Sequence, residues 1–387
     1  MSNNQLVDSK KNRTYYPLLD LFRAIAAFFV VLEHTRNFLW VDYPQLEDPT
    51  IFIRIIYFFS GFGSEFVLIF FVLSGCVVGR IPVDSIRNDK KWDWLDYLIA
   101  RVTRLWVVLI PALALTFILD SISMQLAPSD SFVFNSNGCA HRALDQVVSE
   151  HLHLTDFIGN VFFVQTILVP TFGSNGALWS LANEFWYYMI FPFLIYSVFG
   201  NLKTILRIVY LFVAVLIMCF VGKDIIIAFP VWLVGVLAYY WGTKRTFSKS
   251  FINIGFIIGL ISIGGALCAS RLGLLNNWMK LSLIAVSFGL TVMCSLHIQV
   301  SSWISNVSSF FSSFSFSLYV IHTPILTLLV APWIAGNEDR IMPDMYGFGL
   351  VIGVIIFIYL ISWLFYLVTE KQTSKVRRFI SNYIKWN

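Results

Sequence analysis

The chain has 387 residues, of which 58% are hydrophobic and only 13% are charged. Because soluble domains carry about 25% charged residues, this composition excludes an ordinary soluble domain and indicates a membrane protein. The formal net charge is +5, but the basic residues fall in short clusters between apolar segments. This pattern excludes the continuous basic surface that a nucleic-acid partner would require.

Taken from the N-terminus, ten segments have the roughly 20 apolar residues that a membrane-spanning helix needs. The first is longer than a signal-peptide core, so we expect it to remain as a membrane anchor. The apolar stretch 157–170 is too short to cross, and we expect it to lie at the interface or to re-enter the membrane. The expected spans are 17–40, 52–79, 101–126, 178–199, 204–222, 224–242, 251–271, 279–298, 310–333 and 346–368.

The charges of the connecting loops alternate along the chain as ten spans require. Lys and Arg gather before the first span, in the second and sixth connections and in the tail, whereas the opposite loops are acidic. Since cytoplasmic loops are enriched in Lys and Arg, we expect both termini in the cytoplasm. The prediction is an all-α polytopic membrane protein with about ten spans, divided into a cytoplasmic segment 1–16, a membrane domain 17–368 and a basic tail 369–387, with no appended soluble domain.

Ionisable residues inside the first predicted span mark a candidate site, because lipid penalises charge. Arg23 and His34 are eleven residues apart, which places them on nearly the same helix face and about 16 Å apart along the axis. Both can line one cavity. Alternatively, Arg23 snorkels to the inner surface and His34 is hydrated at the interface.

The second and third spans carry further candidates. Glu65 precedes the segment FFVLSG at 70–75, whose Ser74 and Gly75 can also serve close helix packing. Arg101 and Arg104 lie on one face at the start of the third span. Two guanidinium groups there can clamp phosphates, or they simply anchor the helix at the cytoplasmic surface.

In the fourth span Glu184 lies about two turns inside the membrane, after Trp179, and a buried carboxylate needs a partner. Counting along the spans places it at the depth of His34, which allows an imidazole–carboxylate pair. In the ninth span Tyr319 and His322 share a face. His322 can instead bind the backbone carbonyl that Pro324 leaves free.

Soft and imidazole ligands gather in the long third loop, but their spacing matches no familiar zinc pattern, so we expect no metal. These residues are Cys139, His141, His151 and His153.

In this order the segments resemble the acyltransferase-3 family of membrane acyltransferases. The resemblance covers most of the chain. It rests on LDLFRAIAAFFVVLEH at 19–34, FFVLSG at 70–75, the Arg101–Arg104 pair, WSL-x-x-E ending at Glu184, SLY-x-x-H-x-P from Ser317 to Pro324, and a closing Glu370. Glu33, directly before His34, departs from the small or apolar neighbour expected there.

The resemblance implies a membrane O-acyltransferase of the bacterial inner membrane. It implies transfer of acetyl from cytoplasmic acetyl-CoA, as donor substrate, to a hydroxyl of a surface or lipid-linked glycan such as O-antigen, capsule or exopolysaccharide. The expected partners are acetyl-CoA, that glycan, membrane lipid and a second copy of the chain, without nucleic acid. The alternative is a transporter or flippase of a glycolipid or small solute, which an inverted repeat with broken helices would favour.

Under the acyltransferase reading, we expect Arg23, Arg101 and Arg104 to hold the CoA phosphates. His34 would be the general base and Glu184 would orient or stabilise it. Five further residues are expected in supporting or acceptor-side positions: Glu65, Ser74, Trp179, Tyr319 and His322.

Overall fold

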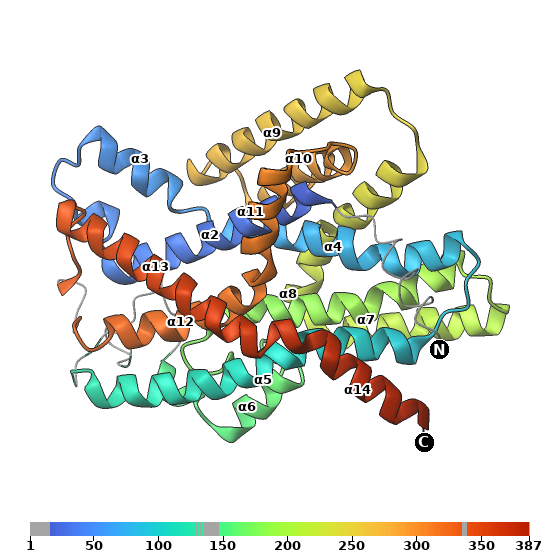
Figure 1. Cartoon of the computed structure of the whole chain (residues 1–387), viewed down its shortest axis with the longest axis horizontal. Helices are drawn as coiled ribbons and strands as arrows, with labels where there is room; N and C mark the ends of the chain where they lie inside the picture. Colours follow the sequence, from blue (N-terminus) through green and yellow to red (C-terminus); the bar gives the residue numbers. More distant parts are fainter. Residues whose placement is uncertain (1–15, 129–130, 132–133, 135–146, 335–338, 387) are drawn as a thin grey trace.

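The computed structural model describes residues 16–128, 131, 134, 147–334 and 339–386. Within these residues the regular structure is helical, and the backbone forms only two isolated β-bridges. Lipid offers the backbone no hydrogen-bond partner, so an apolar chain satisfies its N–H and C=O groups by forming helices. The predicted all-α class is confirmed, and most of the long helices run roughly along the long axis of the molecule (Figure 1).

The α-helices are α2 (Pro17–Leu39), α3 (Ile51–Phe59), α4 (Gly63–Arg87), α5 (Trp94–Leu126), α6 (Leu154–Val161), α7 (Trp179–Phe199), α8 (Thr204–Lys244), α9 (Lys249–Arg271), α10 (Asn277–Ser295), α11 (Ser302–Ser313), α12 (Ser315–Val330), α13 (Met345–Val368) and α14 (Thr373–Trp386). Short 3₁₀ turns join some of them: η1 (Tyr43–Gln45), η2 (Val148–His151), η3 (Gly176–Leu178) and η5 (Glu370–Gln372).

The number of membrane spans differs from the prediction. Among the described residues, six helical segments are long and apolar enough to cross a membrane, and α11 with α12, bent by 48°, makes a seventh if the pair is one span. The count of ten is not confirmed. The predicted spans 17–40 and 178–199 fall on α2 and α7, which polar residues make less apolar. Those at 204–222 and 224–242 fall on α8, counted once among the six, which consists of two helices joined at a kink at Gly222, φ 78°.

Two predicted spans are broken in the structure. The span expected at 52–79 divides into α3 and α4 at residues 60–62, and α3 lies apart from the line of α4 (Figure 1). The span expected at 310–333 begins in α11 and bends at Phe314. The stretch 157–170 contains only the end of the eight-residue helix α6 and turns, which is too short to cross a membrane.

Helix α2 lies inside the bundle, where it packs against α4, α10, α11, α12 and α13. Next to it, α4 and α8 approach so closely that their backbones touch. A Cβ atom on Gly75 would overlap the carbonyl oxygen of Trp232, and one on Gly235 would overlap that of Val72. Small residues permit this approach, as they do in other membrane helix pairs.

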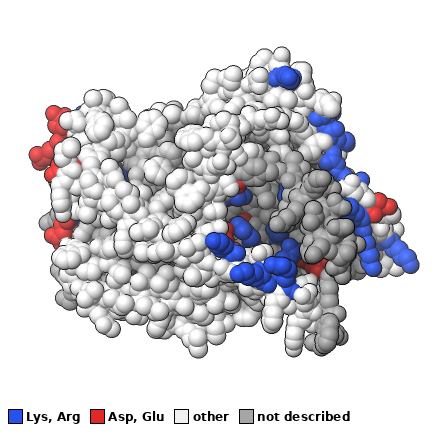
Figure 2. All heavy atoms as spheres, in the orientation of Figure 1, with Lys and Arg blue, Asp and Glu red and all other residues white. Residues whose placement is uncertain are grey.

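Charged side chains separate to the two ends of the molecule. On the face shown in Figure 2, Asp and Glu gather at the left end, most Lys and Arg lie toward the right, and the surface between is largely uncharged. The right end also holds the C-terminus of α14 (Figure 1). This separation follows the alternation of loop charges along the sequence.

Candidate active site

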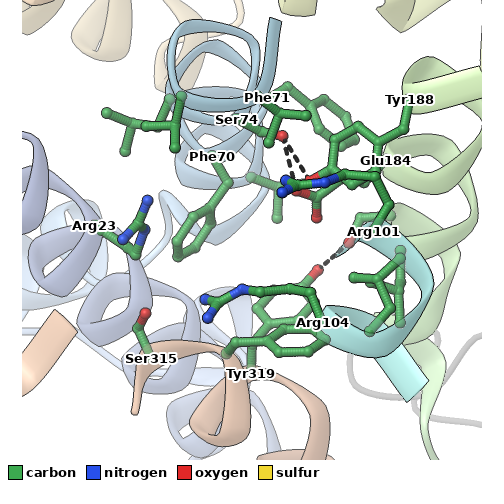
Figure 3. A pocket seen from close by; sticks show the side chains of 18 residues that line it. Arg23, Phe70, Phe71, Ser74, Arg101, Arg104, Glu184, Tyr188, Ser315 and Tyr319 are labelled. Atoms are coloured by element: carbon green, nitrogen blue, oxygen red, sulfur yellow. Dashed lines mark hydrogen bonds between the residues drawn. The ribbon is translucent and has the colours of Figure 1, made fainter. Parts of the chain in front are cut away.

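A cavity of about 320 Å³ opens between α2, α4, α5, α7 and α12 (Figure 3). We call it the first cavity. Its polar groups come from five different helices, so no segment of the sequence contains the whole site. They are the guanidinium groups of Arg23, Arg101 and Arg104, the carboxylate of Glu184, and the hydroxyls of Ser74, Ser180, Tyr188, Ser315 and Tyr319.

Two of the three arginines in the first cavity have carboxylate partners. Arg23 lies 3.3 Å from Asp20, and Arg104 lies 3.0 Å from the buried carboxylate of Glu370. Glu370 also accepts hydrogen bonds from the backbone and hydroxyl of Ser317. Arg23 and Asp20 both bond to Ser312 of α11, and the Arg104–Glu370 pair joins α5 to η5, so these contacts fix two walls of the cavity.

Arg101 forms no ion pair within the described part of the chain. Its guanidinium carbon lies over the rings of Tyr97 and Tyr188, 5.8 Å and 5.9 Å from their centroids. Its Nε atom is buried and lacks a hydrogen-bond partner among the described residues. Aromatic faces stabilise the cation but leave its N–H donors unused, so an anionic ligand would complete this site.

Glu184 belongs to the wall of the first cavity. It accepts a 2.7 Å hydrogen bond from the hydroxyl of Ser74 and another from the hydroxyl of Tyr188. The indole of Trp232 donates to Ser74 from the other side at 3.2 Å. The sequence allowed a pair between Glu184 and His34, but among the described residues the carboxylate bonds to Ser74 of α4 and Tyr188 of α7 instead.

His34 instead meets a second histidine. Its Nδ1 atom lies 2.8 Å from Nε2 of His322, and the two rings stack with centroids 5.0 Å apart and planes 20° apart. His322 is fully buried. The ring of Tyr319, whose hydroxyl lines the first cavity, lies 5.9 Å from that of His322.

The hydrogen bonds of His322 determine its tautomer. Its Nδ1 atom lies 2.7 Å from the backbone carbonyl oxygen of Tyr319, which can only accept, so Nδ1 carries the proton. The Nε2 atom of neutral His322 is then an acceptor, and the bond between the rings runs from Nδ1–H of His34 to it. The Nε2 atom of neutral His34 therefore keeps its lone pair, and it has no hydrogen-bond partner among the described residues.

Pro324 does not account for the position of His322. A proline in a helix frees the carbonyl four residues earlier, here that of Val320. This carbonyl accepts a 2.7 Å hydrogen bond from the side chain of Asn175 instead. The imidazole of His322 is therefore not needed at the proline and remains available to His34.

A second, more polar cavity of about 300 Å³ lies at the other end of α2. We call it the second cavity. Helix α2 contributes to both, with Arg23 in the first and Glu33, Arg36 and Asn37 in the second. His34 lines neither cavity, but it directly follows Glu33 of the second one. The remaining lining residues of the second cavity are Trp40, Val41, Asp42, Tyr43, Tyr57 and Arg271.

The structure brings six of the ten predicted site residues to the first cavity: Arg23, Ser74, Arg101, Arg104, Glu184 and Tyr319. His34 and His322 form the adjoining pair. Glu65 and Trp179 line neither cavity. Glu65 is buried and bonds to Ser270 at 2.7 Å, while Trp179 is partly exposed, with its ring against Phe71.

Sequence reasoning missed Asp120, a fully buried residue of α5. It accepts two hydrogen bonds of 2.7 Å from Ser174, one from the backbone and one from the hydroxyl. The next residue is Asn175, which holds the free carbonyl of α12 beside His322. The available signal was an aspartate inside the apolar segment FILDSIS at 117–123. Asp120 thus fixes the segment that precedes α7, from which Asn175 contacts α12.

The proposed ligands of the long loop are only partly described. Cys139 and His141 lie outside the described residues, while His151 ends η2 and His153 precedes α6. The expectation that the loop holds no metal stays a prediction.

Comparison with known proteins agrees with this geometry. A family model described as an acyltransferase domain matches residues 16–367. A curated protein named O-acetyl transferase, from Shigella phage Sf6, is 23% identical over 280 residues, which cover 71% of this chain and 76% of that protein. The comparison with solved structures gave no match.

Proposed function

Since this chain belongs to the acyltransferase-3 family, and is thus a membrane O-acyltransferase, we propose that it transfers acetyl from acetyl-CoA to a hydroxyl of a surface or lipid-linked glycan. The acetyl group is the one named for the phage relative. The observation that carries the proposal is the histidine pair beside the arginine-lined first cavity, in which Nε2 of His34 has no hydrogen-bond partner among the described residues.

The first cavity suits the donor. CoA presents phosphates, and the guanidinium of Arg101, whose Nε lacks a hydrogen-bond partner among the described residues, offers charge-assisted hydrogen bonds to them. Arg23 and Arg104 add positive charge in the same cavity, although each is partly neutralised by a carboxylate. The phenylalanine and aliphatic side chains of the remaining wall suit the uncharged arm that carries the thioester.

His34 is the general base in the proposed reaction. Its Nε2 takes the proton of the acceptor hydroxyl as that oxygen attacks the acetyl carbonyl carbon. The positive charge on His34 is stabilised because its Nδ1–H donates to Nε2 of His322, whose own Nδ1–H donates to Tyr319. The carbon–sulfur bond then breaks, the proton passes to the thiolate, and an ester and free CoA leave.

The distribution of charge supports an orientation. The arginines of the first cavity lie at the end of α2 nearer the N-terminus, and the acidic loop residues lie near the second cavity. With cytoplasmic loops enriched in Lys and Arg, the donor cavity opens to the cytoplasm and both termini are cytoplasmic. The location we propose is a bacterial inner membrane.

The test is thiol release from acetyl-CoA by the full chain in nanodiscs, with and without extracted envelope glycans. We expect glycan-dependent release, acetyl ester on the glycan, and loss of both in His34→Ala with an unchanged thermal melt. A wild-type protein that binds acetyl-CoA but releases no thiol with any glycan would refute the proposal. Uptake of a glycolipid without ester formation would favour the transporter alternative.

A further inference from the structure

Two arginines of the second cavity converge on one backbone oxygen. Nη1 of Arg36 and Nη2 of Arg271 each donate to the carbonyl of Tyr57 at 3.2 Å. The guanidinium of Arg36 also lies 5.2 Å from the centre of the Tyr57 ring. Neither arginine forms an ion pair with a carboxylate of the described residues. Arg36 also donates to the side-chain oxygen of Asn37. Neutral oxygens carry no formal charge that could balance two neighbouring cations.

The carboxylates of this cavity have other partners. Asp42 is paired at 2.8 Å with Arg340, whose side chain is only 2% exposed. Glu33 accepts a hydrogen bond from the backbone N–H of Gly63, where α4 begins. Counting Arg340 with the lining residues, three arginines face two carboxylates, so the cavity holds one positive charge in excess.

The remaining lining groups suit a sugar. The ring of Tyr43 is 41% exposed and lies 5.6 Å from the ring of Tyr57, which provides an aromatic surface at the cavity. Two further polar side chains line the cavity, Glu33 and Asn37, the second of which accepts a hydrogen bond from Arg36. Ligand sites of this kind combine aromatic walls with a few polar groups that fix the orientation of the ligand.

On the basis of the proposed function, we propose that the second cavity binds the acceptor, and that the acceptor sugar carries a carboxylate or phosphate held between Arg36 and Arg271. Asn37, one of the lining residues, follows His34 by three residues, a rise of about 4.5 Å along α2. A sugar bound through its anionic group would thus have its hydroxyls within reach of the histidine pair.

Binding is measured first, without acetyl-CoA, on the full chain in nanodiscs with glucuronate, glucose 1-phosphate and glucose as ligands. We expect at least one acid to bind about 10-fold more tightly than glucose, because hydrogen bonds to a charged group are stronger than those between neutral groups. Whichever of glucuronate and glucose 1-phosphate binds more tightly shows whether the site prefers a carboxylate or a phosphate. Arg271→Gln should remove the preference for the acid over glucose. Because Arg271 is exposed, we expect the variant to fold.

Arg54→Gln is the matched control. Arg54 lies in α3, three residues before Tyr57, but it is bonded to Pro49 and Asp48 and does not line the cavity. It should keep the acid preference. Equal binding of glucose and the two acids, or a preference that survives Arg271→Gln, overturns the inference.

Acetyl transfer is then measured with acidic and neutral envelope glycans. Transfer to neutral glycans alone, with no acid preference in binding, would contradict this inference and leave the proposed function intact. Acid binding that depends on Arg271, with no transfer to any glycan, would contradict the proposed function and leave the anion site intact.

Discussion

His34 and His322 are 288 residues apart in the chain, yet Nδ1 of one lies 2.8 Å from Nε2 of the other. The contact joins α2 to α12 beside Tyr319, which lines the first cavity. It gives the proposed base a fixed tautomer, because His322 is itself held by the backbone of Tyr319. In the serine hydrolase triad an aspartate has this orienting role; here a neutral imidazole does.

Replacement of His322 by alanine should lower kcat by about 10²-fold, within the range that general base catalysis contributes. The KM for acetyl-CoA should change little, because His322 does not line the first cavity. His322→Gln should recover part of the rate, since its amide oxygen can accept from His34. His297→Ala is the control, because His297 bonds to Gly242 elsewhere. Undiminished kcat in a folded His322→Ala protein would contradict the role of His322 in orienting His34.

Arg101 should determine how strongly kcat/KM depends on the phosphates of the donor. Wild-type protein should prefer acetyl-CoA to acetyl-pantetheine, and Arg101→Gln should reduce the ratio of their kcat/KM values about 10- to 100-fold, the worth of one or two charge-assisted hydrogen bonds. Arg207→Gln should leave the ratio unchanged, because Arg207 bonds only to the carbonyls of Ser197 and Val198. An unchanged ratio in both variants would place the phosphates elsewhere.

Asp120→Ala should destabilise the protein by about 2 kcal/mol or more, because it leaves a buried N–H and a hydroxyl of Ser174 without an acceptor. Asp120→Asn keeps one acceptor oxygen and should cost less. Thermal melts in detergent measure both. A melt of Asp120→Ala equal to that of the wild type would show that Ser174 finds another partner.

The contact of α4 with α8 should tolerate no Cβ atom at Gly75. Gly75→Ala should destabilise by about 1–3 kcal/mol, since the clash is with backbone that must shift. Gly264→Ala, in α9, is the matched control. Apart from the backbone of α9 and its chain neighbours, no atom of the described residues lies within 4 Å of the added methyl there, so the variant should be neutral or about 1 kcal/mol more stable.

Much of the chemistry of the site could be predicted from local patterns. Arginines three residues apart must share a helix face, and Arg101 and Arg104 do line one cavity. Charged residues within apolar segments likewise identified Arg23, His34 and Glu184, because lipid allows such groups only where protein covers them. The same rule, applied to Asp120, would have found the residue that the prediction missed.

The partners of these groups were decided by the tertiary structure. The positions of His34 and Glu184 along their predicted spans place both residues at the same depth in the membrane, which allowed a contact between them. Depth alone gives neither the rotation of a helix about its axis nor the helices that pack against it. The packing of α7 on α4 and α8 turns Glu184 to Ser74, while the contact of α12 with α2 presents His322 to His34. Sequence periodicity determined the helices and their polar faces because these depend on residues a few positions apart. The histidine pair and both cavities depend on contacts between distant segments, which only the folded bundle fixes.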